Sequence, residues 1–129
     1  MSTQKKLLLV STFGSYPGFD KVFRDYQYQV TKVATLRKAL SSIKQIKPQV
    51  IVAEFVYAPT YGSQLSNFES LFAAAQTYVP GANFIALTHK DDLHHYEQVS
   101  LNVKNCQLLT LPADTSSLAA CLDAVTVDG

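Results

Sequence analysis

The chain has 129 residues, of which 47% are hydrophobic and 16% are charged, and its formal net charge is +1. These values are typical of one globular domain with an apolar core, so we expect a single domain over residues 1–129 and exclude a disordered chain. The balanced charge gives no electrostatic basis for direct contact with nucleic acid. The two cysteines lack metal-ligand spacing, so we expect reduced thiols, no metal site and no cofactor.

The N-terminal apolar stretch covers only Leu7 to Val10. That stretch is too short for the core of a signal peptide, and no later apolar run approaches the length that spans a membrane. We therefore expect a cytoplasmic protein that makes no contact with a membrane.

The first part of the chain predicts two strands around a short helix. Lys6–Ser11 carries a continuous apolar run, which is typical of a strand buried on both faces. A segment rich in turn-forming residues follows, and a short helix is expected at about Phe19–Asp25. Tyr28–Ala34 alternates in polarity, as a strand nearer the edge of a sheet does.

An amphipathic helix and a second fully buried strand come next. Thr35 is the expected N-cap of the helix, and apolar residues recur at helical spacing from Leu36 to Ile46. Pro48 ends the helix, and Val50–Glu54 predicts a strand buried on both faces. Because ligands bind beyond the carboxyl ends of parallel strands, Glu54 is expected to face a site.

A long loop, Val56–Leu65, leads to the next pair of elements. Ser66 and Glu69 form the pattern of a capping box, which predicts a helix that runs to about Tyr78. Asn83–Thr88 then predicts a fourth buried strand.

The last part of the chain predicts a helix, a strand and a final helix. Lys90 is expected to open a helix through about Ser100, because the acidic residues that follow suit a helix N-terminus. Gln107–Leu111 predicts the fifth strand, and Asp114 or Thr115 is expected to cap the final helix. Strands and helices thus alternate five times, which predicts an α/β fold with a doubly wound five-stranded parallel sheet and five helices.

With these elements in place, the chain resembles the receiver domain of response regulators, the phosphoacceptor module of two-component signalling and phosphorelays. Three stretches carry the resemblance, Lys47–Glu54, Phe84–Asp92 and Leu108–Asp114, and it extends over roughly residues 5 to 126. It implies a flavodoxin-like fold with strand order 2-1-3-4-5.

The resemblance also implies where phosphoryl transfer takes place in that family. An acidic pair after the first strand normally holds Mg²⁺, a cation that prefers carboxylate oxygens. Ser11 and Thr12 stand in its place. The phosphoacceptor is an aspartate, and Glu54 takes that position with one more methylene group.

Two further family positions lie at the ends of the fourth and fifth strands. Thr88 matches the hydroxyl residue that contacts the phosphoryl group, whereas Leu111 replaces the lysine before Pro112. The family's switch aromatic is Leu108 here. Loss of the metal carboxylates and the cation removes most of the electrostatic stabilisation of phosphoryl transfer. The residues therefore indicate a degenerate pseudo-receiver that is not an enzyme, is not phosphorylated and acts through protein contacts.

Several alternatives stay open from the sequence. Glu54 either mimics a phosphorylated acceptor or is a polar residue bonded to backbone amides or to Thr88. The domain is alternatively a receiver that is phosphorylated weakly. A third interpretation is a flavin or nucleotide binder, because the loop after the first strand is rich in Ser, Thr and Gly.

The expected partner is a signalling protein, either a sensor kinase or an output regulator, or a second copy of the chain. Tyr57 and Tyr61 lie on the long loop, where aromatic residues either anchor a partner or fold down as a lid. Receiver domains pair through the fourth helix, fifth strand and fifth helix, and there the resemblance points to Tyr96 and Leu108.

Overall fold

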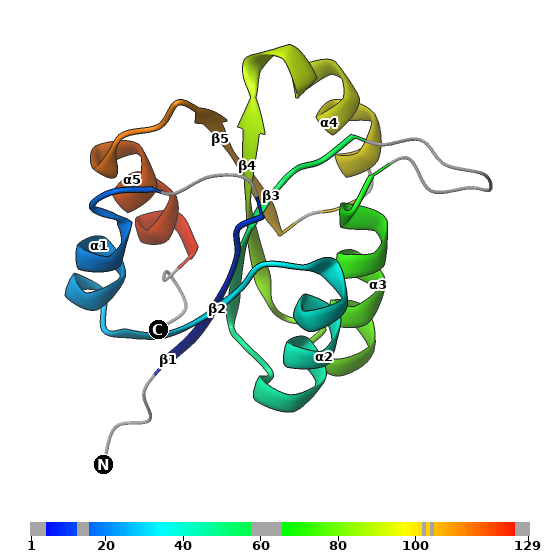
Figure 1. Cartoon of the computed structure of the whole chain (residues 1–129), viewed down its shortest axis with the longest axis horizontal. Helices are drawn as coiled ribbons and strands as arrows, with labels where there is room; N and C mark the ends of the chain where they lie inside the picture. The colour runs from blue at the N-terminus through cyan, green and yellow to red at the C-terminus, as the bar shows by residue number, and fades with distance from the viewer. Residues whose placement is uncertain (1–4, 13–15, 58–65, 102, 104, 126–129) are drawn as a thin grey trace.

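The computed structural model describes residues 5–12, 16–57, 66–101, 103 and 105–125. Five parallel strands form one sheet in the order β2-β1-β3-β4-β5, which confirms the predicted order. Helices cover both faces of the sheet (Figure 1). The strands are β1 (Lys5–Val10), β2 (Tyr28–Val33), β3 (Val50–Glu54), β4 (Asn83–His89) and β5 (Cys106–Leu111).

The helices divide into two layers, with α1 and α5 on one side of the sheet and α2, α3 and α4 on the other (Figure 1). A short 3₁₀ helix, η1, precedes α4, so the helix that the sequence predicts from Lys90 begins with a 3₁₀ turn and becomes α-helical at Leu93. The bounds are α1 (Phe19–Asp25), α2 (Leu36–Ile46), α3 (Phe68–Tyr78), η1 (Lys90–Asp92), α4 (Leu93–Ser100) and α5 (Thr115–Val125).

The core consists of two apolar layers, one on each face of the sheet. Leu7 and Leu9 of β1 pack with α1 and α5, whereas Leu8 and Val10 pack with α2 and α3. Successive residues of a strand point to opposite faces, so a strand that is covered on both sides has to be apolar throughout. This is why the continuous apolar runs of the sequence mark the central strands.

Two of the helix caps that the sequence predicts are present. The backbone N–H of Lys38 donates to Oγ1 of Thr35 at 3.1 Å, which caps α2. Asp114 is the residue that caps α5, because its Oδ1 accepts from the backbone N–H of Ser117 at 2.8 Å.

The predicted capping box of α3 is present in a modified form. The backbone N–H of Ser66 donates to Oε1 of Glu69 at 2.8 Å, while the Ser66 hydroxyl accepts from the N–H of Phe68 at 3.0 Å. Each side chain thus satisfies a backbone donor at the start of the helix.

One close packing contact fixes where α1 begins relative to α5. Gly18 precedes α1 with a φ of 87°, a conformation that glycine adopts at little cost. A Cβ atom at this position would lie 2.8 Å from Cγ2 of Thr115. The glycine therefore allows the start of α1 to approach the first residue of α5.

Within the described ranges, no helix has the length and hydropathy needed to cross a membrane.

We expect Thr35→Ala to lower the free energy of unfolding by about 1 kcal/mol, because it removes the cap of α2. Chemical denaturation followed by circular dichroism measures this change. Thr77→Ala is the matched control, since the Thr77 hydroxyl donates to the Ala73 carbonyl within α3 and caps no helix start. Equal losses in the two variants would contradict a specific role for the cap.

Candidate functional site

The candidate site lies at the carboxyl edge of the sheet, where Glu54 ends the central strand β3. Its side chain is buried, with 6% exposure. The backbone N–H of Thr12 donates to Oε1 of Glu54 at 2.6 Å, and the Tyr16 hydroxyl donates to Oε2. The Ser11 hydroxyl makes a longer contact of 3.5 Å with Oε2. The segment after β1 therefore supplies hydrogen bonds to both oxygens of the carboxylate.

These bonds give the buried charge much of the solvation that water would otherwise provide. A carboxylate without such partners is costly to bury, and hydrogen bonds to an ionised group are stronger than neutral ones. The pKa of Tyr16 is raised above its ordinary range, first by burial and then by the hydrogen bond to Glu54 and its charge. The tyrosine therefore stays protonated and continues to act as a donor. This arrangement fits the interpretation in which Glu54 is bonded to a backbone amide.

The remaining family positions lie close to Glu54 but take other roles. Thr88 is completely buried, and its hydroxyl donates to the Ala86 carbonyl at 3.3 Å. Leu111 is buried at the end of β5. The peptide bond between Leu111 and Pro112 is cis. The fold thus brings the predicted positions to one edge of the sheet, and among these positions Glu54 alone carries a carboxylate.

A cleft of about 380 Å³ opens beside Glu54. None of the lining residues that the structure describes is a lysine or an arginine. The described lining of this cleft therefore presents no cationic side chain to a phosphate, and the flavin or nucleotide interpretation stays a prediction. Residues 13–15, in the loop on which that interpretation rests, lie outside the described residues. The cleft is lined by Tyr16, Pro17, Glu54, Phe55, Val56, Leu87, His89, Leu111, Pro112 and Ala113.

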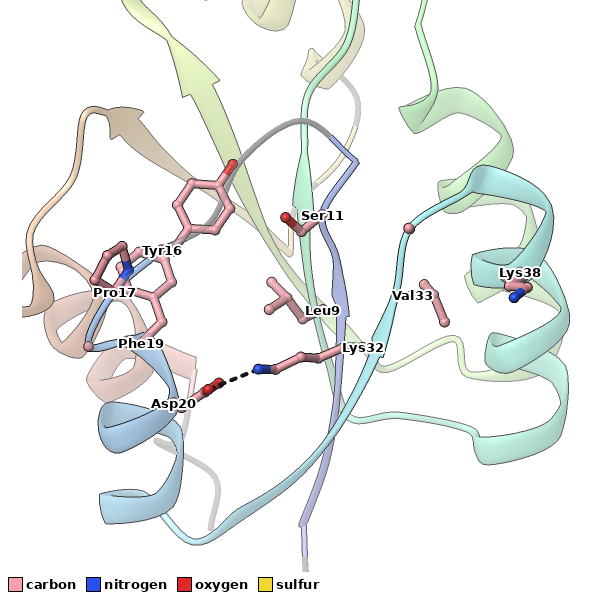
Figure 2. A pocket seen from close by; sticks show the side chains of 11 residues that line it. Leu9, Ser11, Tyr16, Pro17, Phe19, Asp20, Lys32, Val33 and Lys38 are labelled. Atoms are coloured by element: carbon pink, nitrogen blue, oxygen red, sulfur yellow. Dashed lines mark hydrogen bonds and ion pairs between the residues drawn. The ribbon is translucent and has the colours of Figure 1, made fainter.

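A second and larger hollow of about 610 Å³ lies beside the first, over β1, β2 and the start of α1. Tyr16 lines both hollows and lies near Ser11 in the view of the second (Figure 2). Lys32 and Asp20 face each other across it, with Nζ and Oδ2 2.8 Å apart. Both side chains are more than half exposed, so this ion pair contributes little to stability.

The residues at the end of β1 do not fit the Mg²⁺ ion that the receiver fold implies. Ser11 and Thr12 offer no carboxylate, and Glu54 is already engaged by the hydrogen bonds described above. In the described part of the chain, no group of three His, Cys, Asp or Glu side chains is placed to hold a metal. We derive no chemical step through a metal.

The residues predicted to bind a partner have different surroundings. Tyr57 stacks on His95 of α4, with ring centroids 3.5 Å apart and planes 6° from parallel, so its ring is folded down. Tyr61 lies outside the described residues. Leu108 on β5 is 40% exposed and is available to a partner. Tyr96 is only 7% exposed and packs in the core, and its hydroxyl donates to Sγ of Cys106 at 3.3 Å. Its part in partner binding stays a prediction.

Two residues of the site were not predicted from the sequence. Tyr16 donates to Glu54 from the turn before α1. Asn67 fixes the backbone beyond β3, because its Nδ2 donates to the Glu54 carbonyl at 2.7 Å and its Oδ1 accepts from the N–H of Val56 at 2.9 Å. The signal for Asn67 was its place directly before a helix, where asparagine side chains commonly bond to nearby backbone. No comparable local signal pointed to Tyr16.

The sequence matches no protein-family model and no curated protein. The structure is similar to solved response-regulator receiver domains. It aligns with the receiver domain of AraT from Geobacillus stearothermophilus at a TM-score of 0.78 and 17% identity, over 98% of this chain and 95% of that one. The chemotaxis protein CheY4 of Vibrio cholerae gives 0.74 and 22% identity, over 95% of this chain and 99% of that one. Identities this low show a shared fold, so the chain has the receiver-domain fold.

A further relative by structure is a receiver protein from Sinorhizobium medicae, with a TM-score of 0.71 and 16% identity over 95% of this chain and 94% of that one. In all three comparisons the alignment extends over nearly the whole of both chains. The similarity therefore concerns the complete five-stranded unit rather than one of its halves.

We expect Tyr16→Phe to lower the free energy of unfolding by roughly 1.5–3 kcal/mol, because it removes a hydrogen bond to a buried charged group. Denaturant titration at pH 7 measures the change. Tyr28→Phe is the matched control: Tyr28 is also buried, and the structure gives its hydroxyl no hydrogen bond among the described residues. We expect a change below about 0.5 kcal/mol for the control.

The raised pKa of Tyr16 predicts a dependence of stability on alkaline pH. The folded protein keeps the Tyr16 proton at pH values where the unfolded chain, with an ordinary tyrosine pKa of about 10, releases it. Stability from this group is therefore fully present below pH 10 and falls as the pH rises further. The difference in unfolding free energy between the wild type and Tyr16→Phe should shrink above pH 10. A constant difference between pH 8 and pH 11 would contradict this coupling.

Proposed function

We propose that the chain is a receiver-like module of two-component signalling that is not phosphorylated, is not an enzyme and acts through protein contacts. The observation that carries the proposal is the set of hydrogen bonds from Thr12 and Tyr16 to the Glu54 carboxylate, at the position of the family's phosphoacceptor. A carboxylate that attacks a phosphoryl group must present one oxygen in line with the leaving group. Here both oxygens accept hydrogen bonds from the protein.

The electrostatics of the site support the same conclusion. Phosphoryl transfer spreads negative charge over the phosphoryl oxygens, and metal ions and lysine side chains normally stabilise it. At this site Ser11 and Thr12 replace the metal carboxylates and Leu111 replaces the lysine. An incoming phosphoryl group would therefore meet the charge of Glu54 without a compensating cation from these positions.

The proposed partner is a sensor kinase, an output regulator or a second copy of the chain. We place this interaction in the cytoplasm and expect the chain to contact neither a membrane nor nucleic acid. The exposure of Leu108 on the edge strand β5 supports this surface as the point of contact. Exposed apolar side chains on a sheet edge are common features of protein interfaces. Tyr57 is less suited to the role of anchor, since its ring is already stacked on α4.

Incubation with acetyl phosphate and Mg²⁺, followed by intact mass spectrometry, tests the proposal. We expect no adduct of about 80 daltons, the mass of one transferred phosphoryl group. Glu54→Asp should also stay unmodified, because it restores the acceptor without the metal carboxylates or the lysine. An adduct on Glu54 of the wild-type protein would show that the domain is a weakly phosphorylated receiver instead.

A variant with the complete family set, Ser11→Asp, Thr12→Asp, Glu54→Asp and Leu111→Lys, provides the positive comparison. We expect it to acquire the adduct in a manner that depends on Mg²⁺, since all four positions meet at one edge of the sheet.

Size-exclusion chromatography of the wild type and of Leu108→Glu then tests the self-association alternative. A shift from dimer to monomer in the variant would support a second copy as the partner, and a monomeric wild type would exclude it.

A further inference from the structure

The cleft beside Glu54 has the walls of a small-molecule site rather than those of a phosphoryl site. Leu87 and Leu111 are buried residues on neighbouring strands, and Phe55 is buried just beyond β3. Pro112 and Tyr16 add further apolar surface to the lining. Ligand pockets in proteins are typically apolar clefts with a small number of polar groups that fix orientation. Glu54 and Tyr16 supply polar groups of that kind.

The charge of the cleft limits what it can hold. Glu54 places a carboxylate in the wall, and the described lining contains no lysine or arginine. An anionic group placed beside Glu54 in these partly buried surroundings would be repelled by the like charge. Phosphates, carboxylates and nucleotides are therefore disfavoured, whereas uncharged molecules face no such penalty.

The size of the cleft limits the ligand further. If each non-hydrogen atom takes roughly 30 Å³, the share of a water molecule in the liquid, 380 Å³ holds about a dozen atoms. The rings of Tyr16 and Phe55 together with Pro112 present flat apolar surfaces. A rigid planar molecule loses little conformational entropy when it binds to such surfaces.

We propose that the cleft beside Glu54 binds an uncharged aromatic small molecule of about a dozen non-hydrogen atoms. Such a ligand would occupy the position at which a receiver domain carries its phosphoryl group. The inference concerns the same cleft as the proposed function, but it requires neither signalling nor a partner. The two proposals have separate tests. Phosphorylation of the wild type, detected by mass spectrometry, would overturn the proposed function, whereas ligand titration tests the present inference.

A pair of isosteric probes tests the proposal, namely indole-3-carboxamide and indole-3-carboxylate, which differ in charge. Titrations followed by methyl NMR at pH 8 measure both affinities. We expect the carboxamide to shift the methyl signals of Leu87 and Leu111 and to bind at least about tenfold more tightly than the carboxylate. Absence of carboxamide binding at millimolar concentration, or equal affinity for the two probes, would overturn the proposal.

Two variants locate the site. Ala113→Phe places a ring in the cleft and should weaken carboxamide binding at least about tenfold. Ala73→Phe, on the exposed side of α3, is the matched control and should leave the affinity unchanged. Equal effects of the two substitutions would overturn the assignment to this cleft. Thermal unfolding checks that both variants fold.

Leu111→Lys gives a second and independent variant, because it supplies a cation next to Glu54. We expect it to reduce or reverse the preference for the carboxamide over the carboxylate. An unchanged preference in a folded Leu111→Lys protein would show that the charge of the cleft does not select the ligand. The wild-type comparison of the two probes remains decisive if either substitution prevents folding.

Discussion

A carboxylate that is buried at the end of the central strand has to be stabilised by protein groups, and this requirement organises the carboxyl edge of the sheet. Glu54 obtains hydrogen bonds from the backbone of Thr12 and from the Tyr16 hydroxyl, both of which belong to the segment between β1 and α1. Thr12 and Tyr16 must therefore both lie next to the end of β3. Tyr16 also lines both hollows of this edge, and its ring stacks on Phe19 of α1.

The same strand end is fixed from its other side by α3. Asn67 bonds to the carbonyl of Glu54 and to the N–H of Val56, so the residue before α3 takes over backbone bonds that the sheet does not supply beyond β3. Phe55 donates its own N–H to the Leu87 carbonyl and packs its ring against Phe68 and Tyr96. Hydrogen bonds within the protein thus hold the backbone around Glu54 without a contribution from a ligand or a partner.

Much of the fold could be predicted because its signals are local. Apolar runs such as Val50–Glu54 require cover on both faces, and Thr35 caps the helix that directly follows it. The contacts of the site are not local: Tyr16 and Glu54 are 38 residues apart in the chain, and no residue pattern specifies that a turn will fold across to a particular strand. The burial of Tyr96 was not predicted for a similar reason, since its ring packs on Phe55, a long-range neighbour. The helix that the sequence predicts from Lys90 begins with a 3₁₀ turn, since acidic residues suit the first turn of a 3₁₀ helix as well as that of an α-helix.

The substitutions at the receiver-domain positions have a common electrostatic explanation. In that pattern several carboxylates are balanced by a divalent cation and a lysine, so removal of the cations alone would leave mutually repelling charges in a buried place. This chain has Ser11 and Thr12 where the metal carboxylates would be, and Leu111 where the lysine would be. One carboxylate is left, and hydrogen bonds from hydroxyl and amide groups can stabilise a single buried charge. The apolar Leu111 then contributes to the wall of a cleft, which gives the same edge of the sheet a chemistry suited to uncharged molecules.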